Sequence, residues 1–225
     1  MTRCVLVTGA ARGIGAAIGE RLEADGWHVH AVDVDDGDLT TPAGNRAVVD
    51  AALARFDGKL DAVVANAGFQ HVAPLRDFPE EQWDALVALL LTSPFLLAKY
   101  AWDALAASGD GRFLAVASVH GLVASPFKAG YVAAKHGVIG LVKVLALEGA
   151  DVGISASALC PAYVRTTLVE EQLRDRSEDD LLAPQAVKRL LDPAEVAAAA
   201  SWLLGPDGRA VTGTPFVMDL GWTAR

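Results

Sequence analysis

The sequence has few cysteines and no surplus of positive charge. Of its 225 residues only Cys4 and Cys160 are cysteines, and both lie in apolar runs. Without a secretory context this usage favours buried thiols in a reducing compartment over a disulfide. The chain has 19 lysine and arginine residues against 28 aspartate and glutamate residues, a formal net charge of −9. That balance argues against a nucleic-acid or anionic-membrane surface.

Other patterns that define whole protein classes are also missing. The sequence has no spacing of cysteine, histidine or carboxylate residues typical of a metal site, so no metal is expected. It begins directly with a strand pattern, without the pattern of a signal peptide or a membrane-spanning run. Repeats, low-complexity tracts and linkers are absent from it. We therefore expect one domain over 1–225, cytoplasmic, with no membrane or nucleic-acid partner.

What the sequence does contain is an alternation of strand-like and helical patterns. Hydrophobic residues make up 52% of the chain, enough for a large core. Such alternation is typical of an α/β fold, here a single Rossmann-type doubly wound parallel sheet. The predicted strands cover 4–8, 28–34, 60–66, 112–118, 154–160 and 215–218. The predicted helices are a first one with Ile14, Ala17, Ile18 and Leu22 on one face, those over 42–56, 80–107 and 131–148, and one that begins with the capping sequence Asp192-Pro-Ala-Glu195.

Two details of the helical pattern lead to local expectations. Pro94 lies inside the long middle helix and should kink or split it, because proline lacks an N–H and its ring clashes with the preceding turn. The polar stretch 170–180 is either a mobile segment, such as a lid, or a solvated helix.

A tyrosine and a lysine four residues apart indicate acid–base chemistry. Tyr131 and Lys135 lie on one face of the predicted helix over 131–148, with Ser118 upstream. A nearby ammonium group favours the phenolate, so we expect Lys135 to lower the pKa of Tyr131 from its ordinary value of about 10. The pair would then act as a general acid and base near neutral pH. Taken alone, the same spacing also arises by chance on a helix surface.

A glycine-rich loop between the first strand and the first helix indicates a dinucleotide site. In the segment Thr8-Gly-Ala-Ala-Arg-Gly-Ile-Gly15 the glycines allow backbone to approach a diphosphate, and the helix N-terminus supplies N–H groups. Asp33 ends the second strand, where a carboxylate would accept hydrogen bonds from a ribose diol and repel a 2′-phosphate. This favours NAD over NADP. Two alternatives stay open: Asp33 is a turn residue in an acidic run, or Arg12 reaches a phosphate.

Along essentially its full length the chain resembles the short-chain dehydrogenase/reductase family. The matching pieces, in order, are Thr8-Gly-x-x-x-Gly-x-Gly15, Ala65-Asn-Ala-Gly68, Ser118, Tyr131-x-x-x-Lys135, Cys160-Pro161 and Thr212-Gly with Asp219-Leu-Gly221. The resemblance implies catalysis by Ser118, Tyr131 and Lys135. It implies a nicotinamide cofactor bound by Gly9, Arg12, Gly13, Ile14, Gly15, Asp33, Asn66, Ala67, Gly68, Tyr131, Lys135, Pro161 and Thr166.

A narrower resemblance is to the D-3-hydroxybutyrate dehydrogenases within that family. It rests on Phe69-Gln-His-Val-Ala-Pro74, the run from Ser118 to Lys128, Tyr131-Val-Ala-Ala-Lys-His-Gly137 and Gly221-Trp-Thr-Ala224. In those enzymes polar side chains and a tryptophan bind the carboxylate of a short hydroxy acid. The residues in the corresponding positions here are Gln70, His120, Lys128 and Trp222, with Gln172 a weaker match. A solvated Lys128 and a packed His120 are the alternatives, and we expect His71 on the surface.

The chain departs from the family pattern in several places. Leu90 occupies the position of the asparagine that usually kinks the middle helix and holds a water of the proton relay. Ala162, Leu220 and Ser157 replace two glycines and an asparagine, and could narrow the cofactor groove. The segment 33–41 is too short for the usual third strand and its helix, so we predict six strands rather than seven, with Asp38 and Leu39 near the adenine edge.

These features together predict an NAD-dependent oxidoreductase that interconverts a short hydroxy acid and a keto acid, with 3-hydroxybutyrate and acetoacetate favoured. One alternative is a general carbonyl or 3-oxoacyl reductase of the same family. Another is a catalytically impaired nucleotide-binding member, because Leu90 and the shortened chain weaken the usual machinery. Family members are usually tetramers, so we expect a homotetramer or homodimer.

Overall fold

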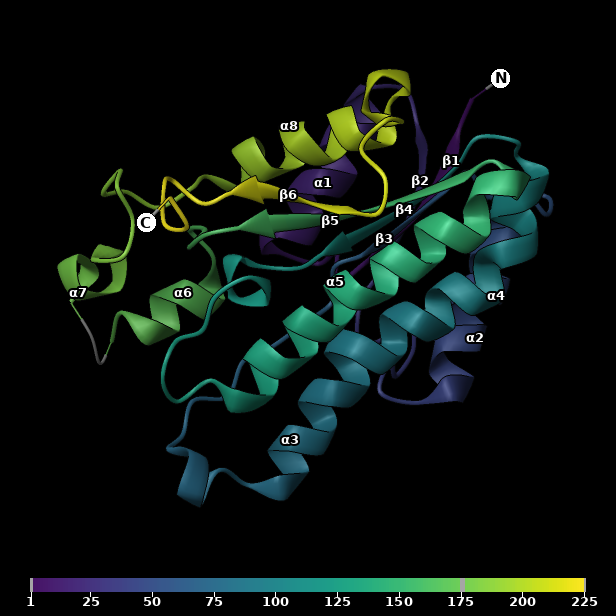
Figure 1. Ribbon diagram of the computed structural model, residues 1–225. Coiled ribbons are helices and arrows are strands. Elements are labelled where there is room, and N and C mark those ends of the chain that lie inside the picture. Colours follow the sequence, from purple (N-terminus) through teal and green to yellow (C-terminus); the bar gives the residue numbers. More distant parts are fainter. Residues whose placement is uncertain (1, 175–176, 225) are drawn as a thin grey trace.

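One parallel six-stranded sheet forms the centre of the protein. A computed structural model describes residues 2–174 and 177–224, and the strand order is β2-β1-β3-β4-β5-β6 (Figure 1). The strands are β1 (Cys4–Thr8), β2 (His28–Val32), β3 (Ala62–Ala65), β4 (Gly111–Val116), β5 (Ile154–Pro161) and β6 (Thr214–Met218). The order reverses direction after β1, which is the doubly wound arrangement predicted from the sequence.

The sheet has six strands, as predicted from the short segment after β2. This segment, 33–41, contains a turn and then leads directly into α2 (Pro42–Arg55). Asp36 stops β2 early, because its carboxylate accepts a hydrogen bond from the Asp33 N–H at 2.8 Å. Leu39 contributes to the hydrophobic core, whereas Asp38 is exposed and its carboxylate accepts from Thr40.

Helices cover both faces of the sheet. One face carries α2, α4 (Ser93–Ala107) and α5 (Ala129–Gly149), and the other carries α1 (Gly13–Ala24) and α8 (Pro193–Leu204) (Figure 1). Two short helices, α6 (Thr167–Gln172) and α7 (Glu178–Leu182), lie beyond the carboxyl ends of β5 and β6. The predicted capping box of α8 is confirmed. The Asp192 side chain accepts from backbone N–H groups of the first turn, and the Glu195 carboxylate accepts from the Asp192 N–H.

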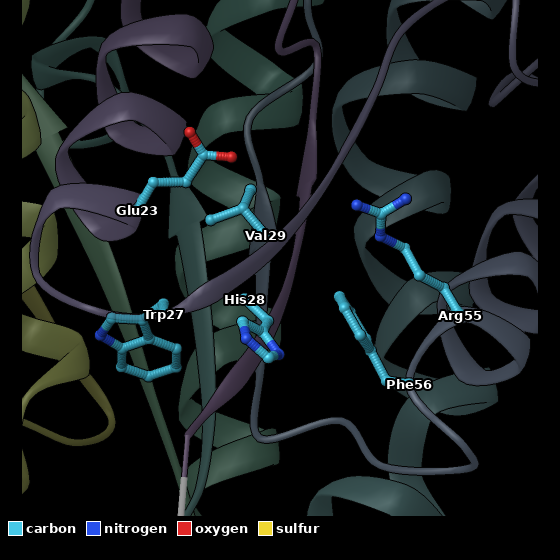
Figure 2. Close-up of a pocket in the computed structure, with 6 residues that line it drawn as sticks. All are labelled: Glu23, Trp27, His28, Val29, Arg55 and Phe56. Atoms are coloured by element: carbon cyan, nitrogen blue, oxygen red, sulfur yellow. The ribbon is translucent and has the colours of Figure 1, made fainter.

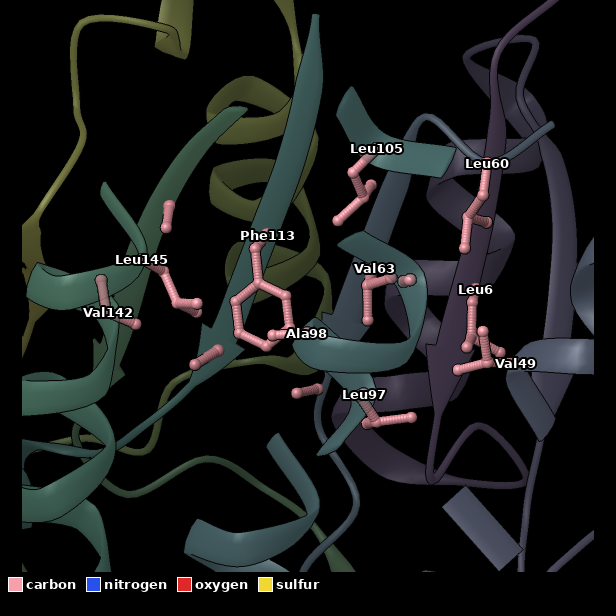
Figure 3. Packing of buried hydrophobic residues seen from close by; sticks show 14 of the residues in the cluster. Leu6, Val49, Leu60, Val63, Leu97, Ala98, Leu105, Phe113, Val142 and Leu145 are labelled. Atoms are coloured by element: carbon pink, nitrogen blue, oxygen red, sulfur yellow. The ribbon is translucent and has the colours of Figure 1, made fainter. Parts of the chain in front are cut away.

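Alternate residues of each strand enter two separate hydrophobic layers. Leu6 and Val63 point toward α2 and α4, where Figure 3 shows them packed with Leu97 and Phe113. Val7, one residue further along β1, belongs to the layer under α1 and α8. Both layers are buried, which explains why the strand sequences read as continuous apolar runs. The thiols of Cys4 and Cys160 are free and buried within the first layer, as expected.

The long middle helix is irregular near Pro94. It consists of α3 (Glu80–Val87), a π-helical segment (Ala88–Thr92) and α4, so the predicted kink takes the form of a wide turn. Pro94 lies in the first turn of α4, where its missing N–H removes the α-helical partner of the Leu90 carbonyl. The π-helical segment ends at Thr92, two residues before Pro94.

Two helical runs, Glu80–Ala107 and Ala129–Val152, are long and apolar enough to span a membrane by length and composition alone. Leu97 and Ala101 in the first, and Val138 and Val142 in the second, are buried in the hydrophobic layer against the sheet. Core helices of α/β proteins pass the same test.

The predicted mobile or helical stretch 170–180 lies partly outside the described residues. Within it, 170–172 end α6 and 178–180 begin α7, whereas 173–174 form a turn and Ser177 caps α7, its hydroxyl accepting from Asp180 N–H. The described part is therefore helical at both ends and not a single helix.

Candidate active site

The predicted catalytic residues lie together beyond the carboxyl end of β4. Ser118 comes two residues after this strand, and its hydroxyl accepts a hydrogen bond from His120 N–H at 3.1 Å, which starts a short 3₁₀ helix (Val119–Gly121). Tyr131 and Lys135 lie in the first two turns of α5, which packs against that helix. The carboxyl edge of a parallel sheet is where open α/β folds bind their ligands.

The ionisation of Tyr131 and Lys135 differs from the sequence-based expectation. Burial raises the pKa of Tyr131 to about 12, although its hydrogen bond with Ser118 acts in the opposite direction. The Lys135 ammonium donates to the Val116 carbonyl at 2.6 Å, with Nζ 5.7 Å from the centre of the Tyr131 ring. Burial also lowers the pKa of Lys135 to about 8. The expected depression of the Tyr131 pKa was wrong, because desolvation of the buried phenol is the largest effect on it.

The glycine-rich loop forms a closely packed cradle between β1 and α1. Gly9 has φ +65°, and a Cβ there would lie 2.7 Å from Ala67 Cα. A Cβ on Gly15 would lie 2.1 Å from the Gly9 carbonyl oxygen. Asn66 fixes this arrangement, because its amide donates to the carbonyls of Thr8 at 2.9 Å and Gly9 at 3.1 Å. The strand–loop–helix geometry fits the diphosphate of a dinucleotide.

Asp33 lies at the end of β2, beside the glycine-rich loop. Its carboxylate accepts hydrogen bonds from Ala11 N–H and from Val34 N–H, each at 2.8 Å. Arg12, the N-cap of α1, is exposed and shows no side-chain capping bond. The Asp33 carboxylate and the Arg12 guanidinium therefore lie on the side of the loop where the adenosine half of a dinucleotide would bind.

The remaining predicted cofactor residues surround the same cradle. Thr166, the N-cap of α6, brings its methyl group to 3.2 Å from where a Cβ on Gly13 would be. A cavity of about 340 Å³ lies next to this contact and is lined in part by Gly13 and Thr166. The others are Ile14 in the first turn of α1, Ala67 and Gly68 after β3, and Pro161 at the end of β5.

Four of the five predicted substrate residues form one cluster next to Ser118 and Tyr131. The buried Lys128 ammonium donates to Gln172 Oε1 at 3.1 Å. The buried His120 ring lies 5.3 Å from the ring of Trp222 and 6.1 Å from that of Tyr131, measured between centres. The burial of Lys128 excludes the solvated alternative, whereas the buried His120 also fits the alternative of a packed side chain.

Gln70, the fifth predicted substrate residue, lies on the loop after β3. Its Oε1 atom is buried and has no hydrogen-bond partner among the described residues. This loop is linked to the loop that carries Lys128, because Ala73 N–H donates to the Phe127 carbonyl at 2.9 Å. His71, expected on the surface, is half-buried with its ring 5.3 Å from that of Phe78.

His120 is held as a neutral group. Burial, reinforced by the charge of Lys128, lowers its pKa to about 3. Its Nε2 atom makes a 2.8 Å hydrogen bond with the hydroxyl of Ser125. A lysine ammonium and a neutral imidazole N–H can both donate hydrogen bonds to a small anion.

The sequence reasoning missed Tyr163. This buried residue follows β5 by two positions, and its hydroxyl accepts from the Lys128 ammonium at 3.3 Å. Its ring lies 5.4 Å from that of Trp222 and 6.1 Å from that of His120. An aromatic residue directly after Cys160-Pro-Ala162, at the carboxyl edge of the sheet, was the signal that could have indicated it.

The substitutions relative to the family pattern occupy three different environments. Ser157 lies inside β5, four residues or about 13 Å before Pro161, too far upstream to narrow a groove at the strand end. Ala162 packs in the layer under α1 and α8, and its N–H donates to the Met218 carbonyl. Leu220 adopts φ +54°, and its carbonyl accepts from the N–H groups of residues 186 and 187.

A further cavity of about 350 Å³ lies near the start of β2, at the end of this strand opposite to Asp33 (Figure 2). Its lining residues are Glu23, Trp27, His28, Val29, Arg55 and Phe56. They include none of the predicted catalytic, cofactor or substrate residues, so this cavity is separate from the candidate active site.

A parallel doubly wound sheet with a serine, tyrosine and lysine beside a dinucleotide cradle defines an oxidoreductase. The family model described as enoyl-(acyl carrier protein) reductase matches residues 9–223. A D-beta-hydroxybutyrate dehydrogenase of Rhizobium meliloti is 36% identical in an alignment of 259 positions, which covers 100% of this chain and 100% of that protein. One from Cupriavidus necator is 37% identical, covering 99% of this chain and 98% of that protein. An acetoacetyl-CoA reductase of Rhizobium meliloti is 33% identical over 95% of each chain. The protein belongs to the short-chain dehydrogenase/reductase family.

Proposed function

We propose that this protein is an NAD-dependent oxidoreductase that interconverts a short hydroxy acid and its keto acid, with 3-hydroxybutyrate and acetoacetate as the favoured pair. The observation that carries the proposal is the buried Lys128 ammonium, hydrogen-bonded to Tyr163 and Gln172, in the same cluster as His120 and next to Ser118 and Tyr131. An ammonium group and neutral polar side chains can hold a small carboxylate by charge-assisted hydrogen bonds. The full-length relatives named as hydroxybutyrate dehydrogenases point to the same substrate.

In this proposal each residue has a defined task. Lys128, with Gln172 and Gln70, holds the carboxylate, which fixes the distance of the reacting carbon from the catalytic hydroxyls. Ser118 polarises the substrate oxygen. In the direction of reduction, Tyr131 donates its proton to that oxygen while the carbonyl carbon receives a hydride. The raised pKa of Tyr131, about 12, keeps the phenol protonated and suits this direction.

We propose that the glycine-rich loop, Asn66, Pro161 and Thr166 hold the nicotinamide cofactor, which supplies or accepts the hydride when bound. The preference for NAD is argued from Asp33, whose carboxylate next to the loop would repel a 2′-phosphate. Arg12 is the competing feature, because it would attract that phosphate. The ratio of kcat/KM with NADH to that with NADPH, in the wild type and in Asp33→Ala, tests this preference.

The experiment that tests the function is a panel of reductions and oxidations. Acetoacetate, acetoacetyl-CoA and an uncharged ketone are reduced with NADH, and the reverse reactions are followed at mildly alkaline pH. We expect the highest kcat/KM for acetoacetate and almost complete loss of activity in Tyr131→Phe. A preference for the uncharged ketone that survives Lys128→Ala would contradict the carboxylate assignment.

The second candidate is reduction of a 3-oxoacyl thioester, because several relatives carry the names acetoacetyl-CoA reductase and 3-oxoacyl-[acyl-carrier-protein] reductase. The helices next to the site argue against an anionic carrier. The exposed side chains of Glu170, Glu171, Glu178 and Asp179 on α6 and α7 would repel one. A higher kcat/KM for acetoacetyl-CoA than for acetoacetate would favour this candidate.

A third candidate, an impaired member, rests on Leu90. This residue is almost fully buried in an apolar cluster with Leu86 and Ala134, against Phe69 and Tyr131. Leu90→Asn restores the family side chain. A large gain in kcat with unchanged KM would mean that the natural chain is impaired, whereas we expect a smaller change. Because the change also buries an amide, the melting temperature of the variant has to be measured alongside.

We further propose a cytoplasmic homotetramer or homodimer. Large apolar side chains are exposed on α4 and α5, namely Phe95, Val144 and Leu147, and on α8 and β6, namely Trp202 and Val217. Both faces suit subunit contacts. Light scattering of Leu147→Glu and Trp202→Glu should show smaller assemblies than the wild type. The free buried thiols are compatible with a reducing compartment.

A further inference from the structure

Tyr163 connects three residues that were expected to bind substrate. Its hydroxyl accepts from the Lys128 ammonium at 3.3 Å, and its ring centre lies 5.1 Å from the same nitrogen. The ring also packs against those of His120 and Trp222. No other described aromatic residue contacts all three of these side chains.

The backbone of Tyr163 is firmly supported. Its carbonyl accepts from Leu191 N–H at 2.9 Å, and Arg165 N–H donates to the Leu191 carbonyl at 2.9 Å. These two bonds form a parallel bridge between Val164 and Leu191, directly before α8. Tyr163 therefore extends the rigid end of β5, whereas Lys128 lies in the loop that leads into α5 and Gln172 lies in the last turn of α6.

A lysine side chain needs such a support to act as a selective anion site. Its four-carbon stem has many rotamers, and fixing it costs conformational entropy each time an anion binds. The Tyr163 hydroxyl and the Gln172 amide oxygen fix two directions of the Lys128 ammonium before any ligand arrives. The Tyr163 ring also holds Trp222, the residue that closes the cluster from the C-terminal segment.

We infer that Tyr163 is a positioning residue that sets the preference of the active site for carboxylate substrates. It keeps the Lys128 ammonium and the Trp222 ring in place against His120. The inference deepens the proposed function and rests on it for the identity of the substrate, but the binding of a short carboxylate can be measured without any reaction.

The test uses Tyr163→Phe, which removes the hydroxyl and keeps the ring, with Tyr100→Phe as the matched control. Tyr100 lies on α4, where its ring contacts Arg46, far from Lys128 in the sequence and on another helix. Butyrate is titrated into each protein by calorimetry. Because a hydrogen bond to a charged group is lost, we expect its Kd to rise about tenfold in Tyr163→Phe and to stay within twofold in the control.

The kinetic arm compares 3-hydroxybutyrate with 2-butanol, which lacks the carboxylate. We expect the KM for 3-hydroxybutyrate to rise about tenfold in Tyr163→Phe with kcat within twofold, and kcat/KM for 2-butanol to stay unchanged. Equal losses on both substrates would mean general structural support and overturn the inference. So would an unchanged Kd for butyrate.

The two proposals can fail separately. If the wild type turns over neither substrate but Tyr163→Phe still weakens butyrate binding, the reaction is wrong and the positioning role stands. If the wild type turns over 3-hydroxybutyrate and the variant retains its KM, the function stands and the role of Tyr163 is wrong. A wild type that does not bind butyrate overturns both.

Discussion

Replacement of Lys135 by methionine should stabilise the protein at neutral pH while abolishing catalysis. The Lys135 side chain is buried, and its pKa falls from the ordinary value of 10.5 to about 8. The folded state therefore binds this proton less tightly than the unfolded state does. Since one pKa unit equals about 1.36 kcal/mol, the charged lysine costs about 3 kcal/mol of folding stability at pH 7.

The pH dependence of this cost has a definite sign. Below pH 8 the lysine is charged in both states and the cost is present in full. Between pH 8 and 10.5 the folded protein loses the proton while the unfolded chain keeps it, so the cost disappears as pH rises. Other groups act in the opposite direction in part of this range. Burial raises the pKa of the Cys160 thiol to about 11, which lowers stability above pH 9.

The assay is therefore a difference between two proteins at each pH. Urea unfolding of the wild type and Lys135→Met is followed by circular dichroism at pH 7, 8, 9 and 10, at one protein concentration. We expect the variant to be more stable by up to about 3 kcal/mol at pH 7, less the lost hydrogen bond to Val116, and the difference to shrink toward pH 10. Lys143→Met, an exposed site on the same helix, should show no such trend. A difference that stays constant from pH 7 to 10 would refute the reasoning.

Three further predictions concern the core, a helix end and the catalytic tyrosine. Phe113→Ala empties a fully buried site between two helices and should lower the free energy of unfolding by about 3–5 kcal/mol, measured with urea. Asp192→Ala removes the capping box of α8 and should cost about 1 kcal/mol in the same assay, whereas Asp207→Ala, at an exposed site in the 3₁₀ helix that follows α8 (Pro206–Gly208), should cost less. Because burial raises the pKa of Tyr131, the rate of alcohol oxidation should increase steadily from pH 7 to pH 9 while ketone reduction does not; an oxidation rate independent of pH would contradict this role of the phenol.

The fold could be predicted because the strands are buried on both faces. β1 was predicted with the bounds observed, Cys4–Thr8, since every side chain in it is apolar or enclosed. The other strand ends were less accurate, and the causes are tertiary. Leu60 is apolar because it packs in the core before β3 begins. Asn66 lies just beyond the end of β3, because its N–H donates to the hydroxyl of Thr8 and not to a strand carbonyl.

The site could be predicted in part from motifs that are close in the sequence, and in part from the family resemblance, which also indicated the distant Gln172 and Trp222. Ser118, His120, Lys128, Tyr131 and Lys135 fall within 18 positions, where the tyrosine–lysine spacing indicated the catalytic pair and the resemblance indicated His120 and Lys128. Contacts across long separations could not be identified in this way. The hydrogen bond of Lys128 to the tyrosine after β5 spans 35 positions. The direction of the Tyr131 pKa was missed for a similar reason, because burial depends on all the elements packed around the phenol.

The family resemblance assigns two roles to one asparagine in the middle helix, and only the first of them is filled in this protein. The first role is to interrupt the helix. Here Pro94 does so, because it offers no N–H to the Leu90 carbonyl, and a π-helical turn in which Ser93 N–H donates to the Ala88 carbonyl comes directly before it. The second role is polar, and the buried side chain of Leu90 cannot perform it, since it packs among apolar neighbours against Tyr131.

We expect a defect caused by Leu90 to act through proton transfer. The helix irregularity is present, and so is the bond between Lys135 and the Val116 carbonyl. In the proposed function substrate affinity depends on the Lys128 cluster, whereas Leu90 packs with Leu86 and Ala134 and lies against Gly68, a predicted cofactor residue. It follows that a proton-relay defect should lower kcat in both directions without raising KM, whereas a degenerate fold or cofactor site would raise KM as well.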